Sequence, residues 1–174
     1  MKFCKYILPL LCLATCLTSC NEPKKLTSYV NPLLGTATLW EPEDLGYIRK
    51  IKGRTWGAEV FPGSSLPNAM VQVSPVTQFR SGAGYQYEDS VIYGFSHTSK
   101  GHWNLLHVPI LPVTGEVTAN DYCSTFSHNN ESARPGYYQV FLDRYNVNAE
   151  LTSTLRCAYH KYTFPNEADK AVLV

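Results

Sequence analysis

Apolar and polar residues alternate along several stretches of the chain, and clusters of Gly, Pro, Asn and Asp separate these stretches. A period of two is typical of a β-strand with one buried face, whereas an amphipathic helix needs apolar residues three and four positions apart. No segment keeps that helical spacing together with a cap and a stop, so the pattern predicts an all-β protein. The expected strands are Ala69–Ser74, Tyr85–Tyr87, Val91–Phe95, Leu105–Val113, Tyr137–Asp143, Val147–Cys157 and Ala158–Phe164.

Many short strands between turn signals favour an antiparallel β-sandwich. The fourth expected strand contains Pro109, which cannot donate a ladder hydrogen bond and therefore predicts a sheet edge or a bulge. The longest alternating run has two faces, and antiparallel sheets commonly bury one face and leave the other in solvent. The face expected in the core carries Val147, Ala149, Leu151, Leu155, Cys157 and Tyr159. The face expected in solvent carries Asn148, Glu150, Thr152, Thr154, Arg156 and His160.

The N-terminus has the pattern of an export signal. Lys2 and Lys5 precede an apolar run from Tyr6 to Leu17, which is too short for a comfortable membrane span. We therefore expect residues 1–19 to be a cleaved signal peptide rather than part of the fold.

The sequence Leu-Thr-Ser-Cys that ends at Cys20 resembles a bacterial lipoprotein processing site. Lipid on Cys20 would anchor an exported protein to the cell envelope, in the periplasm or at the outer membrane. Residues 20–28 would then be a tether and 29–174 the folded domain. The alternative is an ordinary cleaved signal in which Cys20 has no role.

Charge and cysteine content restrict the partners. The formal net charge is +1 with both signs interspersed, so the sequence gives no reason to expect nucleic acid binding. Of six cysteines, only Cys123 and Cys157 lie beyond the signal and the anchor. An exported pair could form a disulfide, or each could remain a free thiol, with Cys157 packed as a small apolar side chain.

Four motifs occur in a characteristic order. They are WGAEVFPGSSLPNAMVQVSPVT from Trp56, SGAGYQYEDSVIYGFSHT from Ser81, HNNESARPGYYQVFLDRYNVNAELTSTLR from His128, and YHKYTFP from Tyr159. In this order and spacing they resemble the N-terminal domain of glycoside hydrolase family 92, the calcium-dependent exo-acting α-mannosidases. The resemblance runs from about Tyr29 to the last residue.

The resemblance implies a galactose-mutarotase-like supersandwich, which here ends in the apolar run Ala171–Val174 and is therefore expected to be incomplete at the C-terminus. It also implies a following (α/α)6 domain as partner, which holds the catalytic acid, the base and most ligands of the calcium ion. We accordingly expect no catalytic residue and no cofactor in this chain. The whole enzyme would remove terminal mannose from glycans with inversion. A freestanding glycan-binding lipoprotein without catalysis is the alternative.

The resemblance also implies substrate-binding residues. The matching loop borders the terminal-mannose subsite and comprises Trp56, Gly57, Phe61, Pro62 and Gly63. Gly63 can also take backbone angles that are closed to other residues. The alternative role for the two aromatic residues is core packing. A sugar site could also use the polar face of the longest run, where Glu150 is expected near Arg156 and His160.

A second substrate-binding stretch comprises His97, His102 and Trp103. Relatives continue this motif as His-Thr-His followed by Ser-Gly, and the departure from that pattern leaves the linkage preference open. A zinc site from His97, His102 and His107 is disfavoured because their spacing needs a loop to gather them. A buried, hydrogen-bonded position is favoured for His107.

The motif that begins at His128 is predicted to be structural. Pro135 and Gly136 are expected to fix the start of a strand, and His128 and Glu131 to satisfy each other or nearby backbone groups.

Overall fold

The structure is a computed structural model that describes residues 24–37, 58, 60–77, 83–98 and 107–174. The predictions for the signal peptide and for Cys20 lie outside these residues. No helix in the described ranges is long and apolar enough to cross a membrane.

The described chain is made of short strands and two 3₁₀ turns, and every strand pairing is antiparallel. The all-β prediction is therefore confirmed. The strands are β1 (Ser64–Ser65), β2 (Gln72–Val76), β3 (Val91–Ile92), β4 (Gly94–Ser96), β5 (Leu111–Thr114), β6 (Ser124–Thr125), β7 (Glu131–Arg134), β8 (Tyr137–Leu142), β9 (Val147–Ser153), β10 (Ala158–Thr163) and β11 (Lys170–Leu173). The 3₁₀ turns are η1 (Leu26–Tyr29) and η2 (His128–Asn130).

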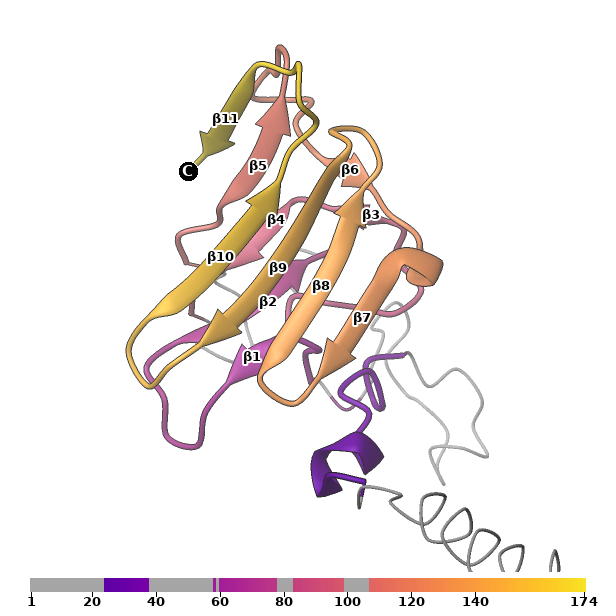
Figure 1. The fold of residues 1–174 in the computed structure, drawn as a ribbon, viewed down its shortest axis with the longest axis vertical. Coiled ribbons are helices and arrows are strands. Elements are labelled where there is room, and N and C mark those ends of the chain that lie inside the picture. The colour runs from indigo at the N-terminus through magenta and orange to yellow at the C-terminus, as the bar shows by residue number, and fades with distance from the viewer. Residues whose placement is uncertain (1–23, 38–57, 59, 78–82, 99–106) are drawn as a thin grey trace, which may run out of the picture.

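Two sheets form the layers of a sandwich. The larger has the order β10-β9-β8-β7, and the three-stranded sheet β1-β2-β4 lies behind it in Figure 1. The pairs β11-β5 and β3-β6 extend the fold at one end. A hydrogen bond of 2.7 Å between the hydroxyls of Ser64 and Ser153 links β1 to β9 across the layers.

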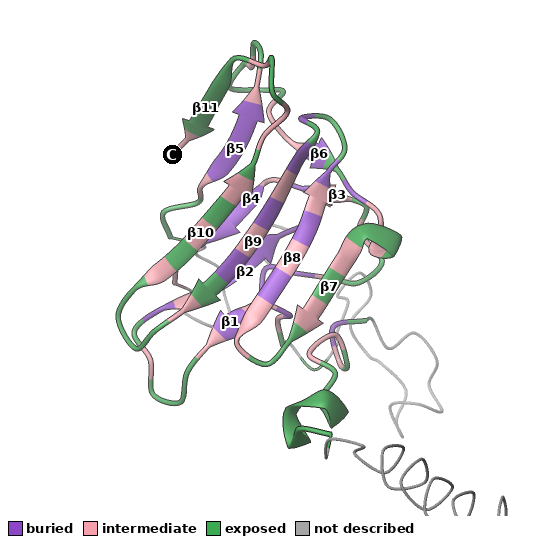
Figure 2. Ribbon diagram, viewed as in Figure 1, coloured by how far each residue is buried: buried purple, intermediate pink, exposed green. Residues whose placement is uncertain are grey.

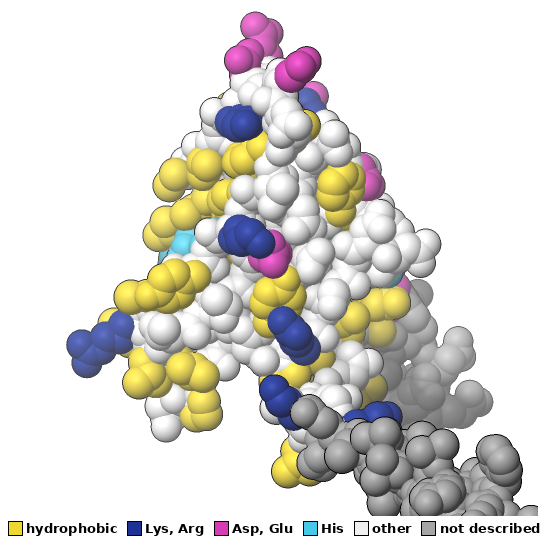
Figure 3. All heavy atoms as spheres, in the orientation of Figure 1, with side chains coloured by type: hydrophobic (Ala, Val, Ile, Leu, Met, Phe, Trp, Pro, Cys, Tyr) yellow, Lys and Arg dark blue, Asp and Glu magenta, His cyan; other side chains and the backbone are white. Residues whose placement is uncertain are grey.

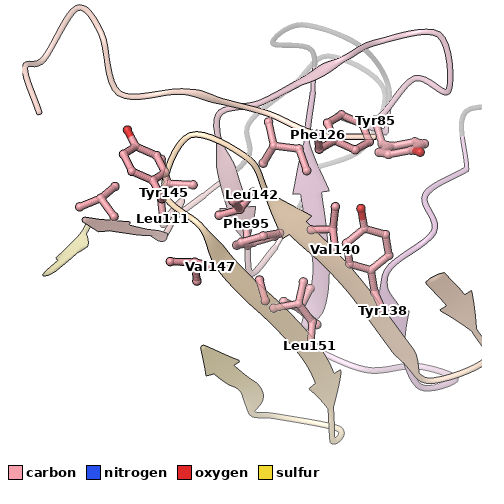
Figure 4. Close-up of a cluster of buried hydrophobic side chains, with 14 of the residues drawn as sticks. Tyr85, Phe95, Leu111, Phe126, Tyr138, Val140, Leu142, Tyr145, Val147 and Leu151 are labelled. Carbon is pink, nitrogen blue, oxygen red and sulfur yellow. The ribbon is translucent and has the colours of Figure 1, made fainter. Parts of the chain in front are cut away.

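The core lies between these layers because β8 and β9 alternate as the sequence predicts. Their inward side chains are all at most 1% exposed and are Tyr138, Val140, Leu142, Val147, Ala149 and Leu151 (Figure 2, Figure 4). Phe95 on β4 meets them from the other layer and is fully buried. Burying each large apolar side chain contributes about 1.5 to 3 kcal/mol, which makes this packing the main cohesive term.

The longest predicted strand is divided by a turn. β9 ends at Ser153, and the Thr154 amide donates to the Cys157 carbonyl at 2.8 Å before β10 begins. This turn resets the alternation, so the prediction that Leu155, Cys157 and Tyr159 belong to the core is wrong, and all three are exposed. Cys157 and Cys123 are free thiols.

Other differences have local causes. Tyr85–Tyr87 is not a strand, because the Tyr85 phenol turns inward to a carboxylate and the Tyr87 amide donates to the Thr36 carbonyl. Pro109 precedes β5 instead of lying within it. The strands β1, β6 and β7 were not predicted, because two to four mostly polar residues give no apolar alternation.

The turn between β7 and β8 is confirmed as a Pro-Gly turn. Arg134 pairs with Tyr137, which leaves Pro135 and Gly136 as the connecting residues. Proline fixes its own φ, and Gly136 has φ +77°, a conformation in which residues with a side chain are strained.

A buried carboxylate joins this hairpin to the rest of the fold. The Glu131 side chain is 0% exposed and accepts from the phenols of Tyr85, at 2.9 and 3.0 Å, and Tyr138, at 2.5 Å. Burial, and then the nearby Glu131 charge, raise the pKa of Tyr85 and of Tyr138, so both phenols keep the protons that they donate.

His128 completes this cluster, as the sequence predicts. Its Nδ1 lies 2.5 Å from Glu131 Oε2, and its Nε2 lies 2.6 Å from the Tyr87 carbonyl oxygen. A carbonyl only accepts, so Nε2 carries a proton, and the Nδ1–Oε2 pair shares another. The ring also stacks on Tyr87 with centroids 4.0 Å apart. The cluster therefore connects η2, β7 and β8 with the segment 85–87.

We expect Glu131→Gln to lower the free energy of unfolding by roughly 3 kcal/mol, because breaking a buried charged pair leaves polar groups uncompensated. Urea denaturation measures this loss. Glu150→Gln is the matched control, since Glu150 pairs with the exposed Lys161 and such pairs contribute less than about 1 kcal/mol. Equal losses in the two variants would contradict a structural role for the Glu131 cluster.

Candidate functional site

The structure describes part of each predicted substrate-binding stretch. Trp56, Gly57, His102 and Trp103 lie outside the described residues, whereas Phe61, Pro62, Gly63 and His97 lie within them. Phe61 is half-buried, and Pro62 is fully buried at the start of β1. The Phe61–Gly63 loop is therefore held against the sandwich by its proline, with its aromatic side chain partly open to solvent.

Gly63 is required for space rather than for its backbone angles. It is not among the glycines with positive φ, so it does not use the backbone angles that only glycine adopts readily. A Cβ at this position would lie 1.9 Å from the Val73 carbonyl oxygen and 2.7 Å from the Ser74 Cα. The loop thus crosses β2 so closely that a side chain cannot fit between them.

The strand β2 brings the two stretches onto one sheet. Ser65 of β1 pairs with Gln72, and the Gln72 amide donates to the His97 carbonyl at 2.9 Å on the opposite side. The strand that follows the Phe61–Gly63 loop and the strand that precedes His97 are separated by two strand spacings, a distance of about 10 Å.

His97 belongs to a chain of hydrogen bonds that enters the core. Its Nδ1 lies 2.8 Å from the Val108 carbonyl oxygen, and its Nε2 lies 3.0 Å from Nε2 of His160. The Nδ1 of His160 lies 2.6 Å from the Tyr162 hydroxyl. The two imidazoles are stacked with centroids 4.8 Å apart, and His160 also meets the ring of Phe95 edge-on.

The Val108 carbonyl sets the direction of this chain. Because a carbonyl only accepts, the proton of neutral His97 is on Nδ1, and its Nε2 accepts from His160. His160 then accepts at Nδ1 from the Tyr162 phenol, whose pKa is raised by burial. Both ring nitrogens of His97 are thus engaged within the fold, and only its ring surface is left for a ligand.

The sequence placed His160 on the wrong face. It was expected beside Glu150 and Arg156 on the polar side, but His160 pairs with Leu151, whose side chain is buried. The turn after Ser153 causes this change of face. Burial, and secondarily the charge of His97, lower the pKa of His160 to about 4. His160, the missed partner of His97, lies 63 residues away in the sequence, and no local motif connects the two.

The remaining candidates for chemistry are engaged or isolated. The described residues contain no group of three His, Cys, Asp or Glu side chains that could hold a metal ion. His107 is exposed and bonds Thr98 Oγ1 through Nδ1 at 3.0 Å, so the expectation of a buried position is wrong. Burial raises the pKa of Asp89, and a hydrogen bond from Thr77 opposes that shift.

Two carboxylates pair with cations. Asp121 accepts two hydrogen bonds from Arg144, at 2.5 and 3.1 Å, and Glu150 accepts one from Lys161 at 2.6 Å. These donors lower the pKa of Asp121 and of Glu150, so both stay ionised acceptors. Neither carboxyl is held in the protonated form that a general acid requires.

Gly63→Ala should lower the melting temperature because the new methyl group must push β1 away from β2. We expect the free energy of unfolding to fall by about 1 to 3 kcal/mol, which is typical of overpacking. Gly115→Ala is the control, since its φ of +70° is unfavourable for alanine but no atom lies within 4 Å of the added Cβ. A loss at Gly63 no larger than at Gly115 would show that the close approach is not a constraint.

The His160 imidazole should make the fold sensitive to acid. The unfolded chain takes up a proton near pH 6.5, whereas folded His160 does so only near pH 4. The unfolding free energy should therefore be highest above pH 6.5, fall as the pH drops toward 4, and level off below that value.

Melting temperatures measured between pH 7 and 3.5 test this dependence. His160→Gln removes the titrating group and should weaken the dependence, whereas His107→Gln, which leaves the stacked pair intact, should retain it. Parallel curves for His160→Gln and the unmodified protein would rule out His160 as the source.

The comparisons with known proteins agree with this architecture. Residues 29–174 match the family model described as "Glycosyl hydrolase family 92 N-terminal domain". No curated protein matches the sequence.

Similar solved structures come from the same family. The family GH92 α-mannosidase BT3965 from Bacteroides thetaiotaomicron, in complex with mannoimidazole, is 32% identical with a TM-score of 0.66, and the match covers 82% of this chain and 18% of that one. The family GH92 inverting mannosidase BT2199 from Bacteroides thetaiotaomicron VPI-5482 is 28% identical with a TM-score of 0.67, covering 86% and 20%. The GH92 family glycosyl hydrolase ccman5 is 28% identical with a TM-score of 0.56, covering 64% and 17%.

The chain thus spans about a fifth of the length of the first two of these relatives. Since the family model extends over residues 29–174 and the strands follow the same arrangement, the chain belongs to glycosyl hydrolase family 92 and corresponds to its N-terminal domain.

Proposed function

We propose that this chain is the N-terminal, cleft-forming part of an α-mannosidase that hydrolyses terminal α-mannosidic bonds of glycans with inversion. The observation that carries the proposal is the family match over residues 29–174, together with 32% identity to a solved α-mannosidase. Inversion is supported by the relative whose description calls it an inverting mannosidase.

In this proposal the chain binds the sugar and the catalytic groups lie elsewhere in the protein. Inverting hydrolysis needs a carboxylic acid and a carboxylate base about 6.5 to 9.5 Å apart. Three of the described carboxylates have structural partners: Glu131 in the buried cluster, Asp121 with Arg144, and Glu150 with Lys161. These contacts support a division of labour in which a further domain supplies the acid and base.

The Phe61–Gly63 loop suits a sugar-binding role. An aromatic side chain covers the C–H faces of a pyranose, and a buried proline with a sterically required glycine keeps that side chain in place. We extend this proposed site to Trp56 and Gly57 on the same loop and to the His97–Trp103 stretch, including His102. Core packing was the alternative role for Phe61, but its side chain is only half-buried, so part of the ring is open to a ligand.

Exposed apolar side chains lie close to the loop in the sequence and support contact with the proposed further domain. Val60, Leu66 and Met70 are 38%, 40% and 70% exposed, respectively. An apolar surface made of such side chains is typical of an interface. We propose that the catalytic (α/α)6 domain covers it and shares the cleft.

The described residues contain no group of three His, Cys, Asp or Glu side chains that could hold a metal ion, so none of them is proposed as a calcium site. The calcium ion that the family resemblance implies is therefore proposed to bind elsewhere in the protein, and no step is assigned to it here. We further propose export and lipid anchoring through Cys20, as expected from the N-terminal sequence.

The full-length protein should hydrolyse an aryl α-mannoside and release β-mannose first, which NMR of the initial product detects. Phe61→Ala should lower kcat/KM by about tenfold or more through lost stacking, with an unchanged melting temperature. Residues 29–174 alone should show no turnover. Turnover by that fragment, or release of α-mannose by the full-length protein, would contradict the proposal.

A further inference from the structure

The outward face of the four-stranded sheet has an ordered arrangement of polar and aromatic side chains. Strand register places Tyr137, Thr152 and Tyr159 in one row across β8, β9 and β10. Gln139, Glu150 and Lys161 form the next row on the same face. Figure 3 shows this side of the molecule, with a basic side chain directly beside an acidic one near its middle.

The first row encloses a hollow. A cavity of about 300 Å³ is lined by Tyr137, Glu150, Leu151, Thr152, Tyr159, His160 and Lys161. Thr152 is small and lies between the two tyrosines, whose strands are roughly 10 Å apart at two strand spacings. The hollow therefore has an aromatic side chain on each side and a short residue between them.

One of these tyrosines is held in place before any ligand arrives. The Tyr137 hydroxyl shares its single proton between Glu150 Oε1 at 2.8 Å and Gln139 Oε1 at 3.0 Å. The Arg134 guanidinium lies 4.4 Å from the centre of the Tyr137 ring. Tyr159, in contrast, is 56% exposed and offers its ring to solvent. A fixed ring costs little conformational entropy when a ligand binds.

The charged groups of the hollow form an ion pair with no net charge. Glu150 Oε2 lies 2.6 Å from Lys161 Nζ, and hydrogen bonds from Lys161 and then Tyr137 lower the pKa of Glu150. The carboxylate can accept from one hydroxyl and the ammonium can donate to its neighbour. Because the two charges balance, the pair favours a neutral ligand with adjacent hydroxyls over an anionic one.

We propose that this hollow binds a pyranose unit of a neutral glycan, at a site separate from the Phe61–Gly63 loop. The two tyrosines would contact the apolar sugar faces, and Glu150 with Lys161 would bind vicinal hydroxyls. The site lies on the outward face of the β7–β10 sheet, whereas the loop precedes β1 in the other layer. A protein partner fits this face poorly, since Lys and Glu are depleted at the centres of protein interfaces.

A second hollow continues the site along the sheet. It has a volume of about 490 Å³ and contains Gln139, Phe141 and Asn148 among its lining residues. Gln139 pairs in register with Glu150, and its Nε2 donates to Asn148 Oδ1 at 3.1 Å. Amide groups and an aromatic ring provide the same kind of contacts, so the face suits a glycan of more than one sugar unit.

The choice of glycan rests on the proposed function, so soluble α-mannan is the probe. The full-length protein is run through native gels that contain increasing mannan, and its retardation gives the apparent Kd. Tyr159→Ala should weaken binding roughly five- to tenfold, which corresponds to the loss of one aromatic contact. Lys161→Met should also weaken it, without disturbing the core because Lys161 is exposed.

Tyr29→Ala is the matched control, because Tyr29 is 71% exposed in η1 and lies outside the sheet. Binding by the cleft is common to all variants, so the difference between Tyr159→Ala and Tyr29→Ala reports the hollow alone. kcat/KM on an aryl mannoside is measured in parallel and should be unchanged by either substitution. Mannan-dependent retardation that requires Tyr159 supports the inference, whether or not the protein hydrolyses mannosides. Absence of hydrolysis would overturn only the proposed function. Equal retardation of both variants, or none in the unmodified protein, would overturn the inference.

Discussion

The fold depends on keeping one buried carboxylate fully hydrogen-bonded. The Glu131 side chain has no contact with solvent, and removing a carboxylate from water is unfavourable unless donors replace the water. Two phenols and an imidazole supply those donors, and they come from the segment near Tyr85, from β8 and from η2. The requirement therefore aligns segments that apolar packing alone would leave free to slide. The four-stranded sheet is built on this aligned hairpin.

The same sheet organises both surfaces that we associate with sugar binding. Its inward side chains bury the layer that contains β2, and β2 carries the Phe61–Gly63 loop on one side and His97 on the other. Its outward side chains form the hollow between Tyr137 and Tyr159. A single alternating pattern thus produces a core on one side and a polar, aromatic surface on the other.

Alternation in the sequence was sufficient to predict β8, β9 and β10, because every second residue along each strand is less exposed than its neighbours. It failed where a polar turn resembled a continued strand, at Thr154–Cys157, and this placed His160 on the wrong face. Gly63 was identified as important, but the reason is a close approach to β2 that no local pattern encodes. The contact between His97 and His160 depends on strand register and on the packing of two layers, which sequence periodicity does not specify.

The hydrogen-bond chain through these two histidines has a chemical direction. It begins at the Tyr162 hydroxyl and ends at the Val108 carbonyl, so neutral His160 and His97 must hold opposite tautomers. Neither ring can change tautomer alone, because two protons or two lone pairs would then face each other. His97 and the inner side of β10 consequently behave as one prototropic unit, so a substitution of His97 or of His160 alters the proton position on the other ring.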